Sequence, residues 1–339
     1  MKRCKLLQIR NYLNKTTCTR YGHYNVNMYM FLSLLSLSLC SLADSKITGA
    51  FVVPHGGIAL APNHFNTTNA TAKEQAWILH KNYRQIGDQI DRSKPDLIFL
   101  STPHGVADLD RFALYLNSAG EGNANTDNIQ CPPACFNVSA NLAFNVAKDI
   151  VRKFNYGFNL TGLSAFGQPG KSDENFPLRW GEVIPLYFIP NLPRIQVIIL
   201  SQPSRRYTDS VSMIPELLEL GCHLYDYLEA LEQSVVVMVS ADLAHTHDKD
   251  GPYGYSDAAE PFDKACGQWA ETLDYTSLLV TAANYVDKAL SCGYTGMVML
   301  HGMLEAGKLS SWIPTLHANY HPSYYGMMLA SFLRHNLLS

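Results

Sequence analysis

Two stretches have the same local order of residues: Phe51-Val-Val-Pro-His55-Gly56-Gly57 and Leu97-Ile-Phe-Leu-Ser-Thr-Pro-His104-Gly105. In each, a short apolar run leads to a proline, a histidine and a glycine, and such a run is typical of a buried strand. The helical pattern of Ala72–Arg92 lies between them. Because the two strands of a strand–helix–strand unit end at the same edge of the sheet, we expect both histidines to enter one cleft.

The same alternation continues along the chain. Apolar runs predict strands at Ile47–Val53, Asp96–Ser101, Val183–Ile189, Arg194–Ser201 and Ser234–Ser240. Helical patterns cover Ala72–Arg92, Leu142–Phe154, Val211–Leu231, Tyr275–Leu290 and Tyr324–Leu337, while Asn117–Cys135 is rich in glycine, asparagine and proline and predicts a surface loop. The order predicts an α/β fold: a single αβα-type domain whose central, mostly parallel or mixed sheet is covered by helices on both faces.

Composition narrows the class of protein. The chain has 339 residues, of which 47% are apolar and 16% are charged, so it can bury a large core and is not disordered as a whole. Its net charge is −3 and it has no block of like charges, which argues against a nucleic-acid partner.

The N-terminus resembles a targeting segment. Met28 to Leu42 contains no charged residue, and Ser41-Leu42-Ala43 then offers the small residues of a cleavage site. We therefore predict that residues 1–43 are an N-terminal extension and signal peptide, with Met28 as an alternative start, and that residues 44–339 form the single folded domain. A retained signal anchor is the alternative.

Secretion is also consistent with four N-glycosylation triplets in residues 44–339, and we predict a secreted glycoprotein. The triplets begin at Asn66, Asn69, Asn137 and Asn159.

Without the leader the chain keeps an odd number of cysteines, which are Cys131, Cys135, Cys222, Cys266 and Cys292. Two disulfides would leave one thiol. Cys131 and Cys135 either close a small loop or are unrelated thiols.

A third strand end carries Asp242-Leu-Ala-His245-Thr-His247. Asp242 can accept a hydrogen bond from an imidazole and set its tautomer, and histidine transfers protons near neutral pH. We expect His247 to be a solvated loop residue. Ser291-Cys292-Gly293 follows a predicted helix, where the simplest interpretation is a helix end with a buried cysteine.

Together these motifs resemble the class III extradiol ring-cleavage dioxygenase superfamily, the family of the protocatechuate 4,5-dioxygenase β chain, which includes the Memo-type proteins. The likeness runs from Val52 to about Phe332 and closes with His321-Pro-Ser-Tyr-Tyr-Gly-Met327. It implies a non-haem Fe(II) site with His55 and His104 as ligands and His245 as the acid–base residue. The implied reaction is the O₂-dependent ring opening of a small catecholic or phenolic substrate.

The sequence departs from this family at the third metal ligand. The dioxygenases use a glutamate where this chain has Cys292-Gly293, which looks like the Memo-type site of two histidines and one cysteine. Glu305 is a poor substitute. In Trp180-Gly181-Glu182, Trp180 stands where ring-cleaving members often have a histidine. A thiolate would also suit copper or zinc.

The resemblance therefore leaves an alternative open: a Memo-like metal-binding protein without ring-cleavage activity. The expected partners are a small aromatic substrate and O₂. A homo-oligomer or a small helical partner subunit also remains open.

Overall fold

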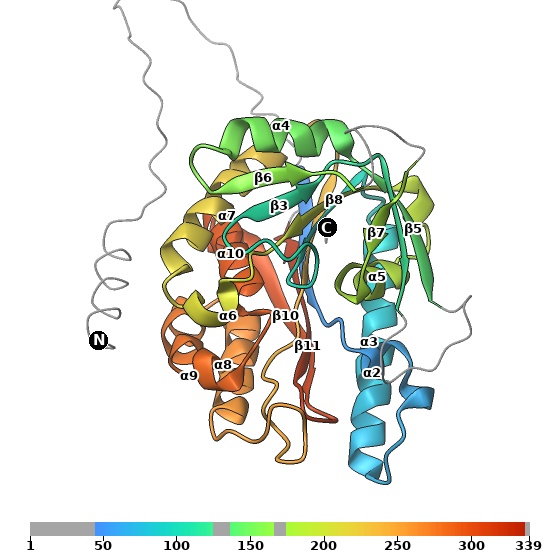
Figure 1. The fold of residues 1–339 in the computed structure, drawn as a ribbon, viewed down its shortest axis with the longest axis vertical. Coiled ribbons are helices and arrows are strands. Elements are labelled where there is room, and N and C mark those ends of the chain that lie inside the picture. Colours follow the sequence, from blue (N-terminus) through green and yellow to red (C-terminus); the bar gives the residue numbers. More distant parts are fainter. Residues whose placement is uncertain (1–44, 125–135, 166–173, 336–339) are drawn as a thin grey trace, which may run out of the picture.

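The computed structural model describes residues 45–124, 136–165 and 174–335, which form a large mixed sheet with helices on both faces (Figure 1). The strands run in the order β10-β11-β1-β9-β2-β8-β5-β4-β7, and β3 branches from β8 to pair with β6. The predicted α/β class is therefore confirmed.

Four parallel strands form the centre of the sheet: β1 (Ile47–Val53), β9 (Val235–Ser240), β2 (Leu97–Thr102) and β8 (Gln196–Ser201). Their residues are almost all buried, as expected for strands covered on both faces. β9 pairs with β1 on one side and with β2 on the other. β9 therefore lies between β1 and β2, the two strands of the predicted strand–helix–strand unit. All of these strands still end at one edge of the sheet.

Shorter strands flank this centre. They are β3 (Phe112–Tyr115), β4 (Ala119–Asn123), β5 (Asn137–Leu142), β6 (Leu160–Leu163) and β7 (Phe176–Leu178). β4 pairs with β5 and β7, so part of the loop predicted for Asn117–Cys135 is a strand. Residues 125–135 of that stretch, with Cys131 and Cys135, lie outside the described residues, as does the leader.

The other edge shows one error of the sequence analysis. Tyr324–Leu337 was predicted as a helix, but β11 (Met327–Arg334) pairs antiparallel with β10 (Trp312–Tyr320) and with β1. Methionine and leucine favour helices, and a short run buried on all sides has no periodicity that separates the two structures. Pairing with two neighbouring strands decides the outcome here.

Val183–Ile189 was predicted as a strand, but most of this segment belongs to the helix α5 (Trp180–Tyr187). The Glu182 side chain accepts a hydrogen bond from the backbone N–H of Arg179, in a capping box that starts the helix. The segment is apolar on nearly every side because it is buried, so its composition resembles a central strand.

The other helices divide between the two faces (Figure 1). Residues of α4 (Phe144–Phe154), α7 (Ile214–Glu229), α8 (Ala259–Thr272), α9 (Ala283–Ala289) and α10 (Tyr294–Ala306) share one hydrophobic core. Residues of α2 (Gly57–Leu60), α3 (Ala70–Arg92) and α5 share the other. Short segments complete the fold: α6 (Arg206–Asp209), the π-helical η3 (Thr276–Ala282), and the 3-10 turns η1 (Pro62–His64), η2 (Leu192–Arg194) and η4 (Leu309–Ser311).

Within the described part of the chain, no helix combines the length and apolar character needed to cross a membrane. Cys266 and Cys292 are buried free thiols, whereas Cys222 is disulfide-bonded.

The crossing of α7 and α10 gives a test of the fold. A Cβ on Gly221 would lie 2.1 Å from the backbone oxygen of Met299, so Gly221→Ala must push the two helices apart. We expect it to lower the free energy of unfolding by about 1–3 kcal/mol, measured by urea denaturation. Gly157→Ala is the control, because its nearest neighbour is 4.0 Å away. Equal stability of the two variants would contradict this packing.

Candidate metal centre

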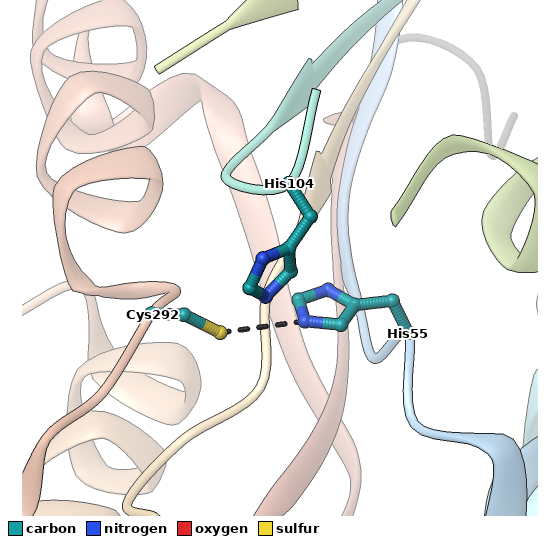
Figure 2. A group of neighbouring side chains, drawn as sticks. All are labelled: His55, His104 and Cys292. Atoms are coloured by element: carbon teal, nitrogen blue, oxygen red, sulfur yellow. Dashed lines mark hydrogen bonds between the residues drawn. The ribbon is translucent and has the colours of Figure 1, made fainter. Parts of the chain in front are cut away.

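The ends of the central strands place three segments of the chain beside one another. His55 follows β1 and His104 follows β2, each directly after a proline, and Cys292 comes from the turn between α9 and α10. One potential ligand atom from each lies within 4.8 Å of the others. Figure 2 shows the two imidazoles and the thiol pointing toward one another. The structure thus brings together the three residues predicted as metal ligands.

His55 is held in one tautomer by a chain of hydrogen bonds. The Ser240 hydroxyl donates to the carbonyl of Gly181 at 2.6 Å, so its oxygen is left to accept the Nδ1 hydrogen of His55 at 2.9 Å. In α5 the Gly181 carbonyl would normally bond the N–H four residues later, but that residue is Pro185, which has none. The lone pair of His55 therefore lies on Nε2, which is 3.3 Å from the sulfur of Cys292.

The site keeps its imidazoles neutral. Burial, reinforced by the neighbouring charge of His104, lowers the pKa of His55 well below its ordinary value. Burial and then Arg206 lower the pKa of His104 to about 3. Both rings consequently have free lone pairs at neutral pH, which a metal ion requires.

Cys292 is positioned by a tight turn against the end of β9. The preceding helix ends at Leu290 in the left-handed conformation (φ 55°), and Ser291 donates from Oγ to the backbone oxygen of Asp242. A Cβ on Gly293 would lie 2.4 Å from Cβ of Ala241, so only glycine fits there. Gly293 therefore starts α10 rather than ending α9. Burial, followed by the charge of Asp242, raises the pKa of Cys292 to about 12.

Asp242 acts on His55 rather than on His245. Its Oδ1 accepts the backbone N–H of His55 at 3.1 Å, and its Oδ2 lies 3.3 Å from Nε2 of the same residue. Burial raises the pKa of Asp242 to about 7. The carboxyl group therefore positions the first histidine, and the tautomer of that ring is set by Ser240.

His245 lies beside the group of three without belonging to it. Its Nδ1 hydrogen is donated to the carbonyl of Leu243 at 3.0 Å, which leaves the lone pair on Nε2. Burial lowers the pKa of His245 to about 4, and its charge in turn lowers the pKa of His55 and His104. A neutral, oriented imidazole next to a metal site can accept a proton.

Aromatic rings lie next to two of these histidines. Trp180 is 4.9 Å from the ring of His104, and Tyr253 meets His245 edge-on at 5.7 Å. Arg179 lies over the Trp180 ring at 4.7 Å. Tyr255 pairs its backbone with His247, and its side chain is exposed.

Neither Glu182 nor Glu305 joins the site. Glu182 accepts hydrogen bonds from Tyr115 and from the backbone of Arg179, and burial raises its pKa to about 7. Glu305 lies 3.6 Å from His301. Within the described residues, the third member beside the two histidines is thus a thiol.

Sequence reasoning missed Ser240 and Arg206. The buried Arg206 donates to the backbone oxygens of Pro103 and Pro203, and so supports the turn that carries His104. Ser240 ends a predicted strand, but its role depends on Gly181, which directly precedes the segment Val183–Ile189 that was predicted as another strand. Pro185 within that segment was the available signal, because a proline has no N–H to donate to the Gly181 carbonyl.

Comparison with known proteins supports the resemblance to ring-opening dioxygenases. Residues 49–330 match the family model described as the catalytic LigB subunit of aromatic ring-opening dioxygenase. Protein CA_C1420 of Clostridium acetobutylicum is 27% identical over 256 residues, which cover 74% of this chain and 52% of that protein, so the chain spans about half the length of this relative.

The uncharacterized protein JW3007 from Escherichia coli K12 has a similar crystal structure, with a TM-score of 0.50 and 12% identity over 84% of this chain and 99% of that one. At this identity the likeness concerns the fold. The family match extends over most of the chain, and the protein therefore belongs to the family of the catalytic LigB subunit of aromatic ring-opening dioxygenases, with its metal-dependent type of fold.

Proposed function

We propose that the protein binds a transition-metal ion through His55, His104 and Cys292 and catalyses the O₂-dependent ring opening of a small catecholic or phenolic substrate. The observation that carries the proposal is the convergence of two neutral imidazoles and a buried thiol within 4.8 Å. Family membership supports the reaction class.

The residues present fit a metal ion. Two nitrogen donors and one sulfur donor suit iron, copper or zinc, and the family makes Fe(II) the first candidate. His55 has its second ring nitrogen bonded to Ser240, the outer support that metal-bound histidines usually have. When bound, the metal would hold the substrate oxygens and O₂ at open positions.

The chain's own residues would then have distinct tasks. His245 would accept a proton from a substrate hydroxyl at Nε2 and return it to the product. Asp242 is a positioning residue, because it holds the backbone of His55. Trp180 and Tyr253 would flank the aromatic ring and limit the access of water.

A second function is favoured by one observation, the thiol in place of a carboxylate. A thiolate is a soft ligand that binds Cu(I) and Zn(II) well, so a Memo-like metal-binding protein without ring cleavage is the alternative. Because burial raises the pKa of Cys292 to about 12, this thiol must release its proton when a metal binds.

Targeting is a separate proposal. We propose that residues 1–43 direct the protein to the secretory pathway, which the uncharged run Met28–Leu42 supports. The asparagines of the glycosylation triplets are all exposed, which supports their modification (Asn66, Asn69, Asn137 and Asn159). A secreted protein whose mass does not fall on N-glycosidase treatment would contradict the proposed glycosylation.

Metal loading tests the main proposal. We expect protein purified anaerobically and loaded with Fe(II) to consume O₂ with a panel of catechols and to form ring-opened products. His104→Ala and Cys292→Ser should lose one equivalent of metal and at least about 100-fold of the activity, whereas the exposed control His64→Ala should keep both. Copper or zinc bound at this site without any ring opening would favour the metal-binding alternative. Unchanged metal content in both variants would reject the site.

Ser240 gives a sharper test of how the site is built. We expect Ser240→Ala to weaken metal binding about 10–100-fold, because His55 loses the acceptor that sets its tautomer. Competition with a chelator measures this affinity. Ser212→Ala is the matched control, since its exposed hydroxyl bonds only its own turn in the described residues. Equal affinities for the two variants would count against the hydrogen-bond chain.

His245 predicts the pH dependence of turnover. A base must be unprotonated, and burial lowers its pKa to about 4, so kcat/KM should fall only as the pH decreases toward about 4. An acid limb near the ordinary histidine value of about 6.5 would contradict this role. His245→Gln should lower kcat about 10²–10⁴-fold while metal content stays unchanged.

A further inference from the structure

A second group of metal-binding side chains lies outside the centre described above. His247 comes from the loop after β9, Glu260 from the first turn of α8, and His321 from the turn between β10 and β11. One potential ligand atom from each lies within 4.8 Å of the others. None of the three residues has a role in the proposed reaction.

His247 is oriented as metal-bound histidines are. Its Nε2 hydrogen is donated to Oδ2 of the buried Asp263 at 2.8 Å, which leaves the ring's lone pair on Nδ1. Oδ1 of Asp263 accepts the backbone N–H of Ala244 at 2.9 Å. A carboxylate behind the imidazole fixes its tautomer and makes it a better ligand.

His321 and Glu260 complete the group from the solvent side. The rings of His247 and His321 are stacked, with centroids 3.9 Å apart and planes 4° from parallel. Burial, and then the charge of His247, lower the pKa of His321 below its ordinary value. The Glu260 carboxylate is 3.4 Å from Nε2 of His321, and its side chain is 72% exposed, so it can adjust to an incoming cation.

We propose that His247, Glu260 and His321 form a second metal site, with Zn²⁺ as the cation that this donor set fits best. Two imidazoles and one carboxylate, with an open position for water, are a common zinc ligand set. The site would link the loop that carries His245 to α8 and to the β10–β11 turn. Through Asp263 and Ala244 it would stabilise the backbone beside the proton-transfer residue.

Zinc titration of the tag-free, metal-stripped protein tests the proposal. We expect His321→Ala and Glu260→Gln each to bind one equivalent of Zn²⁺ fewer than wild type, or to bind it at least about 10-fold more weakly. Both side chains are partly or largely exposed, so the variants should fold normally. Zn²⁺ should also raise the Tm of the Cys292→Ser protein, but not that of Cys292→Ser/His321→Ala.

The outcomes separate the two sites. A zinc equivalent that disappears in Cys292→Ser belongs to the first centre, and one that disappears in His321→Ala but not in His64→Ala belongs to the second. If His321→Ala and Glu260→Gln bind as much Zn²⁺ as wild type with the same affinity, the second site is rejected while the first is unaffected. X-ray absorption should show only nitrogen and oxygen around the zinc retained by Cys292→Ser, and a sulfur ligand there would also overturn the proposal.

Discussion

The hydrogen bond between Ser240 and Gly181 connects the fold to the chemistry of the site. A proline in α5 leaves one helical carbonyl without its usual partner, and the serine at the end of β9 fills that position. Because the serine hydrogen is used there, its oxygen must accept from His55. A helix on one face of the sheet thus determines that the lone pair of His55, at the end of the neighbouring strand β1, lies on Nε2.

Burial shifts the pKa values of the histidines and of the thiol in this centre in opposite directions. Both shifts favour the uncharged form of the side chain. It lowers the pKa of the histidines, which keeps their lone pairs available, and raises that of the Cys292 thiol, which keeps it protonated at neutral pH. The two imidazoles and the thiol are therefore uncharged at neutral pH. A neutral ligand set can be buried at modest cost, whereas a thiolate without a cation could not.

The errors in secondary structure have one physical origin. Val183–Ile189 and Met327–Arg334 are both buried on nearly every side, so neither has the polar face whose spacing separates a helix from a strand. The capping box of Glu182 makes the first segment a helix, and pairing with β1 and β10 makes the second segment a strand. The central parallel strands were predicted correctly because their β-branched runs lie between recognisable turns and amphipathic helices.

The sequence by itself determined the α/β class, the central strands and the histidines at their ends, because parallel strands necessarily end at one edge. It also pointed to His245 at a third strand end, and to Cys292 as a ligand through the resemblance of ordered motifs. Only the tertiary structure decided that β9 lies between β1 and β2, that Asp242 positions His55, and that Ser240 sets the tautomer of that ring. Likewise, His247, predicted as a solvated loop residue, is held by Asp263 and stacked on His321. These contacts join residues far apart in the chain, and local patterns of hydrophobicity contain no information about such pairs.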